Sequence, residues 1–193
     1  MTGMQTPRFP APAMEQLTQT QQAVAREVLK QSSAGLGGPY GMLLKSPELL
    51  RRYLATTDYL RQRTSLPLHL KEMAILIEAR LWDAQYEWWA HEPIARREGL
   101  SEAIIEDLRQ GRRPAAMQAD EEVVYDLVVE LLRDRQLSDA TFQRAVEMLG
   151  EQQTVDLVAT AGFYVFVSTV IIAGRVVPPP GHLAQPMPEL LKA

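Results

Sequence analysis

One stretch of the sequence decides the fold, and it reads LPLHLKEMAILIEARLWDAQYEWWAHEPIARREGLS over residues 66–101. Between residues 70 and 81 its apolar side chains recur at intervals of three and four, the spacing of one face of a helix. Asp83 is expected to cap a second helix, which carries Glu87 and His91 four residues apart and therefore on one face. The stretch predicts two consecutive helices, the second with a carboxylate beside an imidazole.

Three residues define the end of the second helix. Pro93 lies inside it and cannot donate a hydrogen bond to the carbonyl of Trp89, which predicts a bend just after His91. Gly99 is expected to end the helix, and Ser101 to cap the next one. The imidazole is therefore expected at a kink.

Helical spacing continues on both sides of this stretch, and no segment shows the sustained alternation of a strand. Ser46 followed by Pro47, Asp120 and Ser138 are expected to begin helices, and Gly150 to separate two of them. The expected helices cover residues 14–32, 47–60, 70–82, 83–99, 102–111, 120–132, 139–149 and 151–173. The sequence thus predicts an all-α fold of seven or eight helices.

Length and composition favour one globular domain. A chain of 193 residues with 46% hydrophobic content can bury a sizeable core. We expect a flexible arm over residues 1–13, a domain over 14–181 and a tail over 182–193. The net charge of −4 provides no basic face for nucleic acid, and the absence of Cys excludes disulfides and thiol chemistry.

The ends of the chain and its most apolar run predict the location. The N-terminus lacks the basic and apolar regions of a secretory signal, so we expect a cytoplasmic protein. The apolar run from Leu157 to Ala173 is short for a membrane span and contains Gly162 and Ser168. It is expected to be a buried core helix or a subunit-interface helix, and no membrane partner is expected.

The polar residues of the central stretch have structural as well as functional interpretations. His91 can be a catalytic group or a structural histidine packed among tryptophans. Glu87 can simply be the partner, four residues away, that keeps His91 charged, and Glu72 can be an acid on a helix surface. The three histidines are scattered and no H-E-x-x-H pattern occurs, so neither a metal nor another cofactor is expected.

Several short blocks, in order, resemble the carboxymuconolactone decarboxylase family, which includes the AhpD-type alkylhydroperoxidases. They are Leu66-Pro67, Lys71-Glu72 leading into Met73-Ala74-Ile75-Leu76, Ala79-Arg80, Glu87-Trp88 with His91, and Arg96-Arg97-Glu98-Gly99-Leu100-Ser101. The resemblance implies an AhpD-like helical bundle that assembles with copies of itself into trimers or hexamers.

The resemblance also locates the family's reactive positions in this chain. The AhpD-type relay contains a Glu, two cysteines as CxxC and a His four residues after the second Cys. These positions fall on Glu72, Ala84, Glu87 and His91, so both sulfurs are missing. Because peroxide reduction by a dithiol needs a thiolate and a resolving thiol, peroxidase activity is disfavoured.

The decarboxylase branch has a Glu where the second Cys would be, as Glu87 stands here. The resemblance implies a cofactor-free lyase that removes CO₂ from a small carboxylated lactone or a related aromatic-degradation product. His91 suits the general acid, and Glu87 or Glu72 could hold its tautomer. The alternative is a family member that binds a small acid without turning it over.

Five further side chains are candidates for binding the substrate. Arg80, Arg96 and Arg97 could clamp its carboxylate, although such arginines are more often solvated or interfacial, and Arg80 is the one that best follows the apolar stripe inward. Trp88 and Trp89 could wall a pocket. Adjacent residues of a helix point about 100° apart, so one of the two tryptophans is expected in the core.

Overall fold

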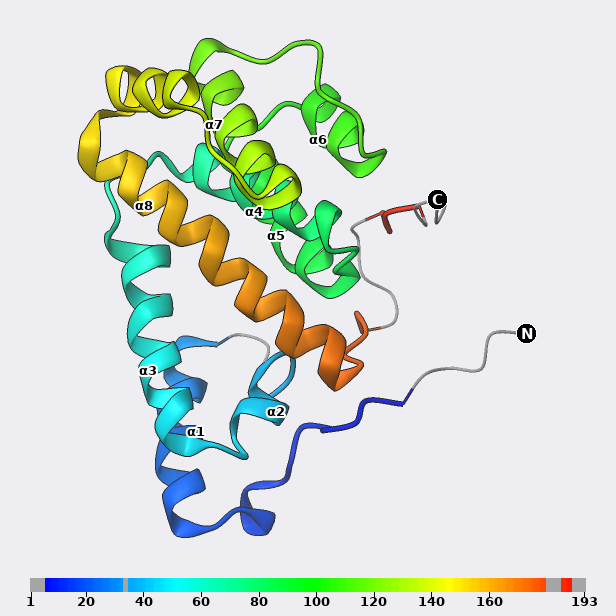
Figure 1. Cartoon of the computed structure of the whole chain (residues 1–193). Coiled ribbons are helices and arrows are strands. Elements are labelled where there is room, and N and C mark those ends of the chain that lie inside the picture. The colour runs from blue at the N-terminus through cyan, green and yellow to red at the C-terminus, as the bar shows by residue number, and fades with distance from the viewer. Residues whose placement is uncertain (1–5, 33–34, 180–184, 189–193) are drawn as a thin grey trace. The chain divides into compact units, whose positions relative to one another are not determined.

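The computed structural model describes residues 6–32, 35–179 and 185–188. Eight α-helices and no strand occur within these ranges (Figure 1), which confirms the all-α prediction. The helices are α1 (Gln19–Gln31), α2 (Tyr40–Leu43), α3 (Pro47–Asp58), α4 (Leu68–Leu81), α5 (Gln85–Arg97), α6 (Glu102–Arg109), α7 (Ala119–Val129) and α8 (Asp139–Gly174). Short π-helical turns, η2 (Tyr59–Arg63) and η3 (Glu130–Asp134), follow α3 and α7.

The chain divides into two compact units. The first comprises Met1–Arg63 and Thr169–Val177, and the second comprises Thr64–Ser168 and Pro178–Ala193. Helix α8 contributes residues to both units. The expectation of a single domain over residues 14–181 stays a prediction, and most of the expected tail, including His182, lies outside the described residues.

In the first unit, the first helix begins later than the sequence pattern predicted. Met14–Gln16 form a separate 3₁₀ turn, and α1 starts after Thr18. The Thr18 hydroxyl accepts a hydrogen bond from the Gln21 amide at 3.3 Å, and the Gln21 side chain accepts one from the Thr18 amide at 3.0 Å. This reciprocal capping box sets the start of the helix at residue 19.

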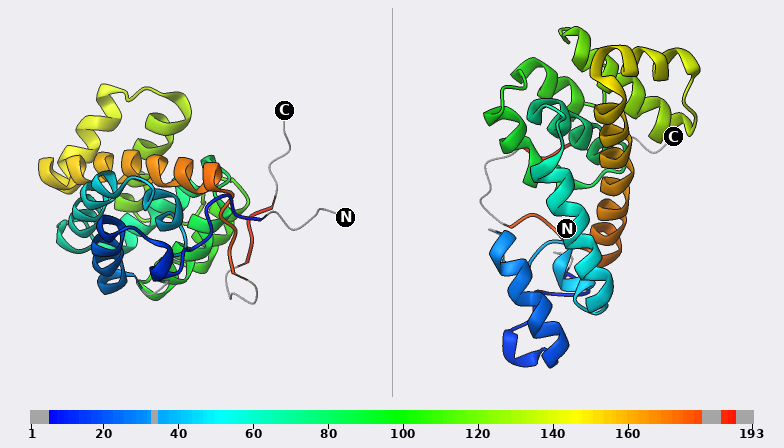
Figure 2. Two further views of the ribbon diagram at one scale, coloured as in Figure 1. Left: turned by 90° about the horizontal axis from the view of Figure 1, so that it is seen from below. Right: turned by 90° about the vertical axis from the view of Figure 1, so that its left-hand side faces the viewer.

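In the second unit, α4 is the central helix. It packs against both α5 and α7, and every residue from Leu70 to Arg80 is buried. Its apolar side chains join a core with Trp88, Leu127 and Leu157, and burying each such side chain contributes about 1.5–3 kcal/mol. Figure 2 shows α7 beside the first part of α8. Because α4 is buried on all sides, its charged side chains are buried too and need partners.

The turn between α4 and α5 corrects the prediction for Asp83. This residue does not cap α5, which begins at Gln85 after Ala84. Asp83 has a left-handed backbone with φ 52°, its amide bonds to the Arg80 carbonyl, and the Ala84 amide bonds to the Ala79 carbonyl at 2.8 Å. This pair of bonds is a Schellman motif, so Asp83 ends α4 instead.

The other capping predictions have mixed outcomes. Ser101 caps α6 by accepting a hydrogen bond from the Ile104 amide at 3.3 Å, and Gly99 follows α5 with φ 98°, as predicted. Asp120 is not the cap of α7, because Gln118 precedes the helix and its amide bonds to the Glu121 carboxylate. Helix α5 continues through Pro93 to Arg97, so the proline does not end it, and the bend after His91 stays a prediction.

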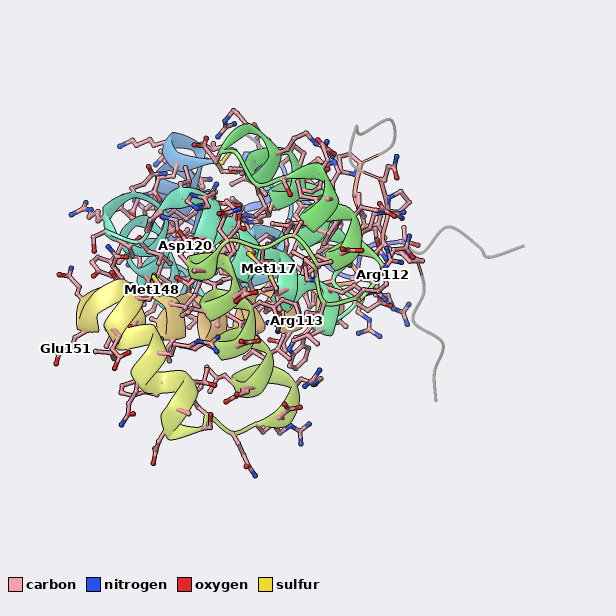
Figure 3. All side chains as sticks on the ribbon, turned by 90° about the horizontal axis from the view of Figure 1, so that it is seen from above. Arg112, Arg113, Met117, Asp120, Met148 and Glu151 are labelled. Carbon is pink, nitrogen blue, oxygen red and sulfur yellow. The ribbon has the colours of Figure 1, made fainter. Side chains whose placement is uncertain are left out.

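Gly150 divides α8 as the sequence predicted. Its backbone has φ 79° and ψ 163°, which is not helical, so two helices meet there at a kink. Met148 and Glu151 lie on either side of it (Figure 3). Ser138 caps the first part, since its hydroxyl accepts a hydrogen bond from the Thr141 amide at 3.2 Å.

Among the described residues, α8 is the one helix long and apolar enough to cross a membrane by length and composition. Half of its most apolar window is buried inside the structure, which is typical of a core helix.

We predict that Gly150→Ala lowers the free energy of unfolding by about 1–3 kcal/mol, because its backbone region is nearly exclusive to glycine. No atom lies within 4 Å of an added Cβ, so the loss comes from the backbone alone. Gly162→Ala is the matched control in the helical part of α8, where a Cβ also meets nothing within 4 Å. That change should stabilise by roughly 0.5–1 kcal/mol. Thermal unfolding measures the stability of both variants, and light scattering checks that their mass is unchanged. Equal effects of the two substitutions would contradict a backbone conformation at Gly150 that only glycine adopts easily.

Candidate active site

A buried row of charged groups joins α4 to α5 in the second unit. The His91 Nδ1 atom lies 2.7 Å from Glu72 Oε2, and the Nε2 atom lies 3.3 Å from Glu87 Oε2. The exposed fractions are 4% for Glu72, 3% for Glu87 and 5% for His91. The structure therefore brings the three expected catalytic residues together, with each ring nitrogen facing a carboxylate.

These two carboxylates decide the charge of the imidazole. Burial by itself lowers the pKa of His91, but the charge and hydrogen bond of Glu72, followed by those of Glu87, outweigh it and raise the pKa to about 9. His91 is therefore an imidazolium at neutral pH, and both ring nitrogens donate hydrogen bonds. The site holds a transferable proton in surroundings that exclude water.

Helix α8 contributes a polar face to the same unit. The Tyr164 ring meets the His91 ring edge-on, with centroids 5.0 Å apart and planes at 90°. Thr160, Tyr164 and Ser168 are all buried and lie four residues apart on one face. We did not predict a role for these residues, because the run from Leu157 to Ala173 was interpreted as an apolar core or subunit-interface helix. The signal that could have found them is this four-residue spacing of polar side chains within an apolar run.

Glu78 is a third buried carboxyl that the sequence analysis missed. It is 0% exposed, its Oε2 accepts a hydrogen bond from Ser168 Oγ at 3.0 Å, and its Oε1 has no partner among the described residues. Burial raises the pKa of Glu78 to about 8, and Glu87 adds to this rise, while the Ser168 hydrogen bond and His91 oppose it. Glu78 is therefore a neutral acid at pH 7, influenced by two residues of the row.

Arg80 is buried, but it is engaged away from His91. Its Nη1 donates to the Pro188 carbonyl at 2.8 Å and lies 3.6 Å from Asp83 Oδ1. Its Nε and Nη2 atoms have no hydrogen-bond partner within the described part of the chain.

Arg96 and Arg97 form ion pairs near the end of α5. Arg96 pairs with Glu92, one turn earlier, and with Glu102, and Arg97 pairs with Glu98 at 2.9 Å. Both guanidinium groups are largely exposed. A role for these arginines in clamping a substrate stays a prediction.

The two tryptophans separate as the helix geometry predicted. Trp88 is fully buried and belongs to the apolar core of the second unit. Trp89 is partly buried, and its ring lies 5.0 Å from that of Tyr86. Whether either ring lines a substrate pocket stays a prediction.

The described residues contain no group of three or more His, Cys, Asp or Glu side chains arranged to hold a metal ion. The chemistry available to this site from its own residues is proton transfer, by an imidazolium and a neutral carboxylic acid.

Comparison with known proteins identifies the fold. No model of a known family matches the sequence, and no curated protein matches it. Two solved structures superimpose on most of the chain. The first is described as an alkylhydroperoxidase AhpD core, an uncharacterized peroxidase-related protein from Ralstonia eutropha JMP134, with TM-score 0.73, 15% identity and coverage of 92% of this chain and 95% of that one.

The second is an uncharacterized peroxidase-related protein from Silicibacter sp. TM1040, with TM-score 0.76, 17% identity and coverage of 94% of this chain and 97% of that one. The chain therefore has the AhpD-like fold, as the resemblance implied. At these identities the comparison establishes the fold alone.

We predict that stability falls as pH rises through the neutral range. Glu78 and His91 both bind a proton more tightly in the folded state. Their contributions are therefore fully present below the unfolded pKa values of 4.5 and 6.5, and are lost as pH rises through about 8 and about 9. Glu78→Gln should flatten the fall in Tm between pH 6 and 8. A change of 1 kcal/mol in the free energy of unfolding corresponds to a shift in Tm of roughly 2–4 °C. Glu147→Gln, which removes an exposed carboxyl of α8, is the control and should leave the profile unchanged. A Glu78→Gln profile identical to wild type would contradict a neutral Glu78.

Proposed function

We propose that this protein is a carboxymuconolactone decarboxylase-like lyase, which acts without a cofactor on a small carboxylated lactone or a related aromatic-degradation product. The observation that carries the proposal is the buried row Glu72–His91–Glu87, with its proton held between two carboxylates. Decarboxylation requires a proton at the carbon that loses CO₂, and an imidazolium is a suitable general acid.

The two hydrogen bonds of His91 suggest different roles for its nitrogens. The shorter contact, from Nδ1 to Glu72 at 2.7 Å, fixes the ring and retains the Nδ1 proton. The contact from Nε2 to Glu87 is longer, at 3.3 Å, so this proton is the one that a substrate can receive. In the proposed reaction the bond to the carboxyl carbon breaks, its electron pair remains on the substrate carbon, and the Nε2 proton is transferred to that carbon.

Glu78 offers a way to restore the proton. Each turnover consumes one proton, and the row is almost closed to solvent. Glu78 is protonated at pH 7 and interacts electrostatically with Glu87 and His91. A neutral acid in this position can return a proton to the row after each reaction. We therefore propose Glu78 as the proton reserve of the site.

A peroxidase is the second candidate, because both structural neighbours are described as peroxidase-related proteins. The absence of cysteine weighs against a thiol mechanism in this chain, where Ala84 and Glu87 stand at the two positions. A third possibility is a protein that binds a small acid at the imidazolium without turning it over.

We also propose that the chain self-associates, as trimers or hexamers. The support is apolar surface that α8 leaves exposed, including Val155 and Ala159, with Phe166 only partly buried on the same helix.

Val155→Glu should reduce the mass measured by light scattering, because it places a charge in this apolar surface. The control is Glu151→Gln, which changes an exposed residue of the same helix. A wild-type monomer at micromolar concentration would contradict self-association.

We predict that His91→Gln lowers the rate of CO₂ release from a carboxylated lactone by about 10²–10⁴-fold, the usual contribution of a general acid. The assay is CO₂ evolution from a panel of carboxylated lactones. His69→Gln is the control, because His69 lies outside the row near Asp120, and it should retain wild-type turnover. Equal turnover by His91→Gln and wild type would exclude His91 as the acid, and bound but unchanged lactone would favour the non-catalytic alternative.

A further inference from the structure

The segment Pro186–Met187–Pro188 is bound by side chains of three helices in the second unit. It has no regular secondary structure of its own. Arg109 Nη1 donates to the Pro186 carbonyl at 3.0 Å, Gln85 Nε2 to the Met187 carbonyl at 2.9 Å, and Arg80 Nη1 to the Pro188 carbonyl at 2.8 Å. These donors stand at the end of α6, the start of α5 and the end of α4.

The main chain of this segment is fully satisfied by side chains. Proline has no amide N–H, so the three residues expose three carbonyls and the single amide of Met187. That amide donates to Gln85 Oε1 at 3.0 Å. The Gln85 side chain thus pairs with both polar groups of Met187, as a neighbouring strand would. Recognition of a main chain by side chains is typical of a bound peptide.

Met187 anchors the segment through its side chain. It is 3% exposed and belongs to the same apolar core as Trp88. A flexible thioether fills an irregular pocket well, and the flanking prolines reduce the entropy lost when the segment becomes ordered. The segment therefore combines a buried anchor with a stiff main chain, two properties of short peptide ligands.

Arg80 indicates that the receiving surface is specialised for this contact. Its guanidinium is buried, and its Nη1 atom donates to the Pro188 carbonyl at 2.8 Å while it lies 3.6 Å from the Asp83 carboxylate. A buried cation that loses its partner is costly. The segment supplies the hydrogen-bond acceptor of this cation from 108 residues away in the sequence.

We propose that the end of α4, the start of α5 and the end of α6 form a binding site for a Pro-Met-Pro peptide, and that residues 186–188 of this chain are its detachable ligand. Gln85 lies two residues before Glu87, and Arg80 lies two residues after Glu78. The ligand therefore stabilises the turn between α4 and α5, the two helices that carry the buried row Glu72–His91–Glu87. Occupancy of the site stabilises this turn by mass action. The proposal does not depend on the reaction that the row performs.

The test uses the full chain with Met187→Asp, which removes the anchor and releases the segment. A synthetic peptide, QPMPELLKA, reproduces residues 185–193. We expect the variant to remain helical by circular dichroism with a lowered Tm, and to bind the peptide saturably with recovery of Tm. The wild-type chain should bind it far more weakly, because its own segment competes at an effective concentration on the order of mM.

Two controls make the test specific. A peptide with Asp in place of Met should not bind, and the double variant Met187→Asp, Gln85→Ala should lose binding by tenfold or more. Gln110→Ala in the same background should retain binding, because Gln110 bonds to Glu106 instead. Failure of the Met187→Asp chain to fold would show the segment to be an integral part of the core and would overturn the proposal. Absence of saturable binding to the folded variant, or binding that ignores Gln85→Ala, would overturn it as well.

Discussion

The structure of the second unit depends on the neutralisation of charge inside a helix pair. Helix α4 is buried on all sides, so its carboxylates lose their hydration on folding and must find compensation within the protein. The imidazolium of His91 supplies it, because one ring nitrogen donates a hydrogen bond to Glu72 and the other donates one to Glu87. The positions of α4 and α5 relative to each other are therefore constrained by hydrogen-bond geometry as well as by apolar packing.

The same constraint explains why Glu78 differs from its neighbours. A further ionised carboxyl beside Glu87 would add repulsion that the single imidazolium cannot offset, and burial already disfavours the charged form. Glu78 instead keeps its proton and takes its hydrogen bond from Ser168 of α8. Glu78 is thus a neutral carboxylic acid, whereas Glu72 and Glu87 are the carboxylate partners of His91. The surroundings of each side chain alone make this difference.

The sequence predicted most of the helices and placed Glu87 beside His91, because periodicity and four-residue spacing are local properties, whereas Glu72 was assigned to the same site only through the family resemblance. Asp83 was assigned to the wrong helix end, since an aspartate favours both an N-cap and a left-handed C′ position. Arg80 was a candidate for clamping a substrate, but its carbonyl partner lies 108 residues away, where no spacing rule applies. Glu78 and Ser168 were missed because single polar residues in apolar runs have no visible partner before the helices pack.

The two prolines of the bound C-terminal segment have one more consequence, which concerns register. The Gln85 side chain offers one acceptor and one donor to the segment, and only Met187 can satisfy both, because each neighbouring residue lacks an amide hydrogen. A shift by one residue in either direction would leave the Gln85 oxygen facing a proline nitrogen and would withdraw methionine from the core. The Pro-Met-Pro sequence therefore permits one alignment on the three helices.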